Sequence, residues 1–84
     1  MINKENLKKQ IIYRSKHRGS KEMDLLLGMF VKKHINLLDI KDLLDLDAIL
    51  NIEDEVLYNW YFFKENKNLI PKCKVSGLLK IFKL

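Results

Sequence analysis

SKEMDLLLGMFV, residues 20–31, carries the most regular hydrophobic pattern in the sequence. Its apolar side chains recur at intervals of three and four residues, as they do along one face of an α-helix. They are Met23, Leu26, Leu27, Phe30 and Val31. Ser20 is a residue type preferred at helix N-caps and stands just ahead of this stripe. The stretch therefore predicts a helix that begins after Ser20 and buries the stripe.

The rest of the chain divides into further segments with helical spacing and short polar joints. Asn3 or Asn6 is expected to cap a first helix that runs to about Lys16. Asp39 and Asp54 are expected to cap the third and fourth helices, and Pro71 is expected in the first turn of a fifth. No stretch alternates cleanly between apolar and polar residues, so strands are not expected.

Each expected helix has its own inward side chains. In the first helix they are Leu7, Ile11 and Ile12, and in the third they are Ile40, Leu43, Leu44 and Leu50. In the fourth they are Leu57, Trp60, Tyr61 and Phe63, and in the fifth they are Val75, Leu78, Leu79 and Phe82. Gly77 lies within the last of these stripes and weakens its helix by about 1 kcal/mol. Because short joints make neighbouring helices antiparallel, we expect an all-α fold, a compact five-helix bundle in a single domain over residues 1–84.

The composition favours a soluble intracellular protein. Eighty-four residues suit one domain, and a hydrophobic fraction of 48% is enough for a core. The one cysteine, Cys73, excludes an internal disulfide framework. No apolar run approaches the roughly 18–20 residues of a membrane span, and the first seven residues hold no apolar signal core. We therefore expect a cytoplasmic, bacterial location and no membrane insertion.

The net charge of +5 is spread unevenly along the chain. Residues 1–34 carry nine Lys/Arg against three Asp/Glu, residues 35–63 carry one against seven, and residues 64–84 carry six against one. Basic ends can serve an anionic partner or can simply keep the surface solvated. A small basic helical nucleic-acid-binding protein is therefore the alternative function. The Leu-rich character of the helix after Ser20 argues against its use as a DNA-recognition helix, and no specific nucleic acid is expected.

The sequence holds little catalytic or metal-binding machinery. No Ser, Cys or Lys stands in a recognisable nucleophile motif, and no glycine-rich phosphate loop is present. The acids around Asp45 and Asp47 lack the pattern of a calcium loop, and His17, His34 and Cys73 lack the spacing of zinc ligands. We expect neither a metal site nor an enzyme.

The joint before the Leu-rich helix places Arg18, Gly19 and Glu22 together. We expect Gly19 to adopt the left-handed conformation that often ends a helix, so that any other residue there costs roughly 1–2 kcal/mol. We expect Arg18 and Glu22 to project from an exposed corner, where an Arg fork suits bidentate capture of a carboxylate. Truncating either charge should then change stability by well under about 1 kcal/mol.

This joint is also where the chain resembles a known family. YRSKHRGSKEMDLLLGMF, residues 13–30, is similar to the succinate dehydrogenase assembly factor 2 family, whose bacterial members are called SdhE. Arg18, Gly19 and Glu22 match the family's Arg-Gly-x-x-Glu signature, Asp24 its usual acidic position and Arg14 its upstream base. LYNW, residues 57–60, matches a second landmark, and Pro71 matches a later proline. Glu53-Asp54 stands where the family usually carries Pro-Asp.

The resemblance implies a five-helix assembly factor that binds the flavoprotein subunit of succinate dehydrogenase or fumarate reductase. The family promotes covalent attachment of FAD to a histidine of that client protein, so FAD belongs to the client and no cofactor is expected to be held stably here. The partner-binding residues that it implies are Arg18, Gly19 and Glu22 at the centre, with Arg14, His17 and Asp24 around them.

Overall fold

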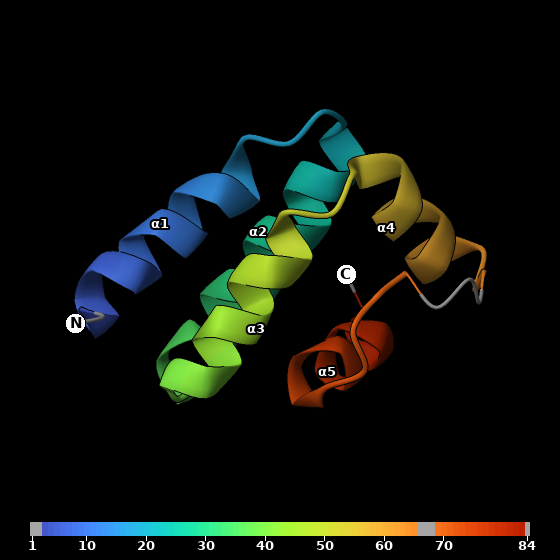
Figure 1. Cartoon of the computed structure of the whole chain (residues 1–84). Coiled ribbons are helices and arrows are strands. Elements are labelled where there is room, and N and C mark those ends of the chain that lie inside the picture. The colour runs from blue at the N-terminus through green and yellow to red at the C-terminus, as the bar shows by residue number, and fades with distance from the viewer. Residues whose placement is uncertain (1–2, 66–68, 84) are drawn as a thin grey trace.

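The computed structural model describes residues 3–65 and 69–83. Within these ranges the chain forms helices and no strand (Figure 1). The helices are α1 (Lys4–Lys16), α2 (Lys21–His34), the short 3-10 helix η1 (Ile35–Leu37), α3 (Ile40–Leu50), α4 (Asp54–Phe62) and α5 (Lys74–Ile81). The predicted all-α, five-helix, single-domain fold is confirmed.

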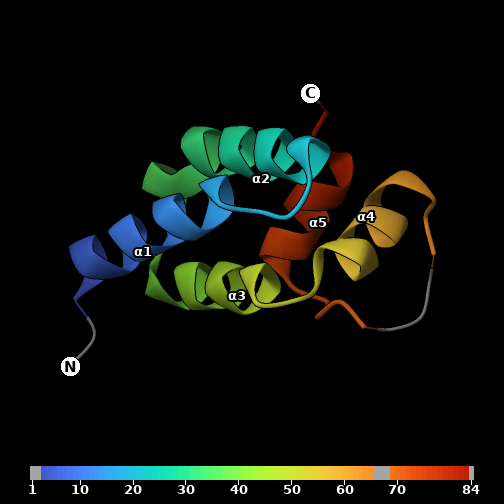
Figure 2. The same ribbon diagram turned by 90° about the horizontal axis from the view of Figure 1, so that it is seen from above.

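The first three α-helices form the body of the molecule. α1 packs against both α2 and α3, and α3 packs in turn against α5. Figure 2 shows α2 and α3 on opposite sides, with α5 between their ends and α4 at the edge of the molecule, farthest from the start of α1. No helix in the described part of the chain is long and apolar enough to cross a bilayer.

The predicted stripe of α2 is the centre of the core. All five of its apolar residues are buried, and Phe30 is among the largest side chains with no exposed surface. Phe82 meets Phe30 edge-on, with ring centroids 5.5 Å apart, so the end of the chain closes over α2. The predicted Leu7, Ile11, Leu57, Val75 and Leu79 are buried, while Ile12, Trp60, Tyr61 and Leu78 pack against the core partly exposed.

For α3, two of the four residues predicted to face inward lie on the exposed side of the helix. Ile40 and Leu44 are each 40% exposed, whereas Leu46 and Ile49 are fully buried beside the predicted Leu43. In the LLDLD run apolar residues occur on both sides of the helix, so their spacing does not select one face. Phe63, also expected inside, is 67% exposed because α4 ends just before it.

Three of the predicted helix starts are confirmed. The side chain of Asn3 accepts the N–H groups of Glu5 and Asn6, so Asn3 rather than Asn6 caps α1. Ser20 Oγ accepts the N–H of Met23 at 3.2 Å and caps α2. Asp39 caps α3 by accepting the N–H of Asp42 at 2.9 Å, and this bond holds the pKa of Asp39 below its usual value.

Two other predictions about helix starts are wrong, the cap at Asp54 and the place of Pro71 in α5. Asp54 is the first residue of α4 but does not cap it, because its carboxylate is turned to another part of the chain. Pro71 lies outside α5, which begins at Lys74. Its start is fixed by Ser76, whose buried hydroxyl accepts the N–H of Cys73 and donates to the Cys73 carbonyl, both at 3.0 Å.

The end of α4 contains an unusual backbone conformation at Lys64. Lys64 has a φ of +55°, the one positive φ of a non-glycine residue in residues 3–65 and 69–83. This turn lets the N–H groups of Phe63 and Glu65 both reach the carbonyl of Asn59, at 3.0 and 3.2 Å. A glycine would adopt this conformation without the steric cost that a Cβ carries.

We predict that Lys64→Gly raises the free energy of unfolding by about 0.5–1 kcal/mol, because relief of the left-handed strain exceeds the added entropy of the unfolded chain. Urea denaturation followed by circular dichroism measures this change. Lys9→Gly, in the interior of α1, is the control and should lower stability by about 1 kcal/mol. Destabilisation by both variants would contradict the strain at Lys64.

Candidate functional site

The joint between α1 and α2 is bound to the joint between α3 and α4 through Arg18. Its guanidinium donates to Asp54 Oδ1 from Nε at 2.7 Å, to the Leu50 carbonyl at 2.6 Å and to the Ile52 carbonyl at 3.1 Å. Its own backbone N–H donates to Asp24 Oδ1 at 2.6 Å. The Arg18 side chain is only 9% exposed. The prediction of an exposed Arg fork is therefore wrong, since its donors are engaged within the chain.

Gly19 lies in the same cluster, and its role differs from the predicted one. No glycine in the described ranges has a positive φ, so the left-handed conformation expected at Gly19 is absent. Instead its N–H donates to Asp54 Oδ2 at 2.6 Å, and an added Cβ would lie 3.2 Å from that same oxygen. Glycine fits here because the carboxylate approaches the backbone closely.

Of the outer residues of the predicted site, Arg14 and Asp24 form bonds within the chain and His17 is exposed. Arg14 forms an ion pair with Asp47 of α3 at 2.5 Å, and Asp47 also accepts from Gln10 at 3.2 Å, so Arg14 joins α1 to α3. Asp24 receives the Arg18 N–H. His17 is exposed at the end of α1, with its ring 4.2 Å from that of Tyr13.

Glu22 is the acidic residue of the motif that stays available. It is exposed in the first turn of α2 and forms no hydrogen bond or ion pair with another described residue. It lines a hollow of about 290 Å³ together with Ser20, Asp54, Glu55 and Tyr58. Asp54 is already paired with Arg18, so the carboxylates of Glu22 and Glu55 are the charges that favour a cationic group at this hollow.

An apolar surface continues from Glu22 along α2. Leu25 and Met29 follow Glu22 at intervals of three and four residues, which places the three on one side of the helix. Leu25 is 53% exposed and Met29 is 47% exposed. We call Glu22, Leu25 and Met29 the outer face of α2. This face combines the negative charge of Glu22 with the exposed apolar area of Leu25 and Met29, as protein-binding surfaces do.

Sequence reasoning missed the central role of Asp54. The residue was identified only as a helix cap, although it stands at the acidic position of the family's Pro-Asp pair. Leu25 and Met29 are also not predicted, because the helical spacing of apolar residues marks the buried stripe of this helix and not its exposed side. In residues 3–65 and 69–83, no group of three or more His, Cys, Asp and Glu side chains is placed to hold a metal ion.

We predict that Arg18→Ala lowers the free energy of unfolding by about 2–4 kcal/mol, since it leaves Asp54 and two backbone carbonyls without their donor. This replaces the expectation of a negligible effect. A double-mutant cycle with Asp54→Ala, measured by urea denaturation, should show that the two losses are not additive. Additive losses would mean that the pair is not coupled.

We predict that Gly19→Ala costs roughly 1–2 kcal/mol in the native sequence and close to nothing in the Asp54→Ala background, because the Cβ conflicts with the Asp54 carboxylate. The same denaturation measurements test this. A cost that persists without Asp54 would point to backbone strain at Gly19 instead.

The comparisons with known proteins agree with the sequence resemblance. Residues 9–82 match the model of a family described as "Flavinator of succinate dehydrogenase". No solved structure matches the chain significantly.

Curated relatives carry related names. The chain is 40% identical over 77 residues to the mitochondrial succinate dehydrogenase assembly factor 2 of Dictyostelium discoideum, covering 92% of this chain and 52% of that protein. It is 33% identical over 73 residues to the FAD assembly factor SdhE of Acetobacter pasteurianus, covering 87% and 64%. The chain thus spans between about half and two thirds of the length of these two relatives. The match of the family model over nearly all of its length shows that the chain belongs to the succinate dehydrogenase assembly factor 2 (SdhE) family, the flavinators of succinate dehydrogenase.

Proposed function

We propose that this protein binds the flavoprotein subunit of succinate dehydrogenase, or of fumarate reductase, and promotes its covalent flavinylation with FAD. Membership of the flavinator family supports the client and the outcome. The observation that carries the proposal is a difference within the motif. Arg18 and Gly19 form hydrogen bonds within the chain, whereas Glu22 is exposed to solvent.

The proposed mode of action is that of a chaperone. The part of the chain that is described offers an exposed acid, two exposed apolar side chains and a shallow hollow, which suit binding rather than bond making. A protein that binds one client conformation raises the population of that conformation by as much as its differential affinity allows. In this scheme the flavin chemistry takes place within the client, FAD is the client's cofactor, and this chain is no enzyme.

The predicted site residues then take two roles. Glu22 is the proposed central contact, with Leu25 and Met29 on the same side of α2, and the exposed His17 at the end of α1 is a further proposed contact. Arg18, Gly19, Asp24 and Arg14 are proposed to position this surface through their internal bonds. The proposed place of action is the compartment where the client subunit takes up flavin, which in a bacterium is the cytoplasm.

We predict that Glu22→Ala and Glu22→Gln change the free energy of unfolding by less than about 1 kcal/mol, because Glu22 is exposed and its main structural contribution is to the helix dipole. Both variants should nevertheless lose covalent flavin on the client. In-gel flavin fluorescence of the client subunit, in cells that produce each variant, gives the readout.

Glu5→Ala is the matched control, since Glu5 is likewise exposed in the first turn of a helix. It should leave flavin incorporation unchanged. Wild-type flavinylation by a folded Glu22→Ala protein would contradict the proposed contact. Loss of flavin in Arg18→Ala should instead follow the loss of folded protein.

A further inference from the structure

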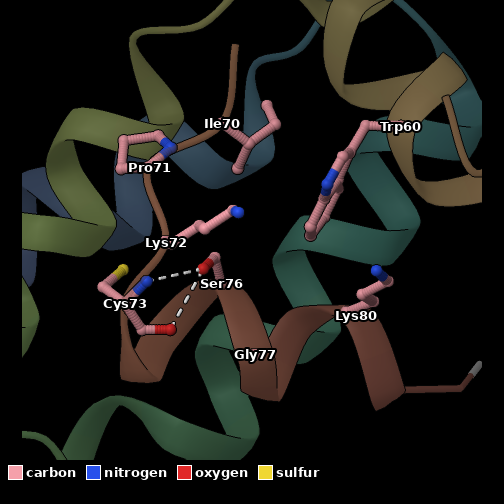
Figure 3. A pocket seen from close by; sticks show the side chains of 8 residues that line it. All are labelled: Trp60, Ile70, Pro71, Lys72, Cys73, Ser76, Gly77 and Lys80. Carbon is pink, nitrogen blue, oxygen red and sulfur yellow. Dashed lines mark hydrogen bonds between the residues drawn. The ribbon is translucent and has the colours of Figure 1, made fainter. Parts of the chain in front are cut away.

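Trp60, the sole tryptophan, lies between three adjoining hollows at the edge where α4 faces α5. The first, of about 300 Å³, is lined by Ile70, Pro71 and residues of α5 (Figure 3). The second, of about 130 Å³, is lined by Val56, Leu69 and Ile70, and the third, of about 350 Å³, is mostly polar in lining. We call these hollows together the Trp60 groove.

The charges around the Trp60 groove are distributed unevenly. Lys72 and Lys80 border both the first and the third hollow, and Lys64 borders the third. Figure 3 shows Lys72 and Lys80 flanking the indole of Trp60. All three lysines are exposed, and none forms an ion pair with another described residue. One end of the groove therefore carries three lysines against one glutamate, Glu65, and contains an aromatic ring.

Two residues of the groove weaken the local structure that contains them. Lys64 occupies a left-handed position that glycine would fill without strain. Gly77 lies inside α5, where alanine would be more stable, and a Cβ there would meet no atom within 4 Å. Packing thus explains neither residue. Lys64 adds a positive charge beside the groove, and the missing Cβ of Gly77 leaves its floor open, so both residues favour a bound ligand with negative charge; local rules are commonly broken at functional sites.

The shape and the charges favour an extended protein segment as the occupant. The hollows adjoin one another on both sides of Trp60, and the apolar floor formed by Ile70, Leu69 and Val56 offers a seat for an apolar side chain. Glu55 and Glu65 border the second hollow, and Glu65 borders the third as well. A continuous phosphate backbone that crossed the second hollow would meet the carboxylate of Glu55, whereas a peptide can place acids at the lysines and neutral residues beyond them.

We propose that the Trp60 groove is a docking site for an acidic protein segment, in which an apolar anchor side chain packs against Trp60 and flanking carboxylates pair with Lys64, Lys72 and Lys80. This surface differs from the outer face of α2, and the proposal does not depend on the proposed function. It assigns a second partner contact to the α4–α5 edge.

The single tryptophan gives a direct readout of this site. We would titrate ¹⁵N-labelled protein with the acetylated hexapeptide Asp-Glu-Phe-Asp-Glu-Leu and follow the one indole N–H signal by NMR. The peptide should shift this signal and amides of α5, with an affinity that weakens as salt rises. The hexapeptide Lys-Lys-Phe-Lys-Lys-Leu should leave the signal in place.

Variants separate the groove from general charge attraction. Lys72→Glu/Lys80→Glu should weaken binding of the acidic peptide at least about tenfold. Gly77→Ala should weaken binding severalfold and raise the melting temperature, because it fills the groove and improves the helix. Lys4→Glu/Lys9→Glu, with the same charge change on α1, should bind almost as the native protein does; Figure 2 shows α1 at the other end of the molecule.

Three results would overturn the proposal. The first is an indole signal that the acidic peptide does not move. The second is an equal loss of binding in the two double variants. The third is tighter binding of ADP or of a single-stranded oligonucleotide than of the peptide at the same lysines, which would assign the groove to a nucleotide or nucleic acid.

Discussion

The Arg18 guanidinium fixes the relation between the two halves of the fold. It binds the last residue of α3, Ile52 in the joint that follows, and the first residue of α4, through the carbonyls of Leu50 and Ile52 and the carboxylate of Asp54. The last carbonyls of a helix have no partner within it, so a buried cation satisfies them efficiently. Asp54 neutralises that cation and also binds the N–H of Gly19. A charge that would be costly alone is thereby fully paired.

α4 depends on this cluster more than the other helices do. It lies at the edge of the molecule (Figures 1 and 2), and Leu57 is its one buried residue. Its first turn is held by Asp54, and near its other end the Tyr61 hydroxyl donates to the carbonyl of Phe82. With both ends attached, α4 borders the hollow that contains Glu22 and also carries Trp60 over its groove. α4 therefore borders both proposed contact surfaces.

Within the family signature, the separate residues contribute in different ways. Arg18 and Gly19 hold the joint, and the exposed Glu22 follows on a helix whose start is fixed by Ser20. Presentation of a rigid surface requires no catalytic cavity. The proposed chaperone role is consistent with a motif that is largely structural. Selection on such a motif can act through the shape of the joint as well as through direct contact with a client.

The sequence by itself determined the helical fold, the buried stripe of α2 and the caps Asn3, Ser20 and Asp39, because helix periodicity and capping are local properties. It also located the joint at Arg18, Gly19 and Glu22. Only the tertiary structure decided what that joint does. Asp54 lies 36 residues from Arg18, and no local pattern pairs them. The exposure of Ile40 and Leu44 likewise followed from which side of α3 its neighbours cover, since apolar residues on both sides leave that choice to packing.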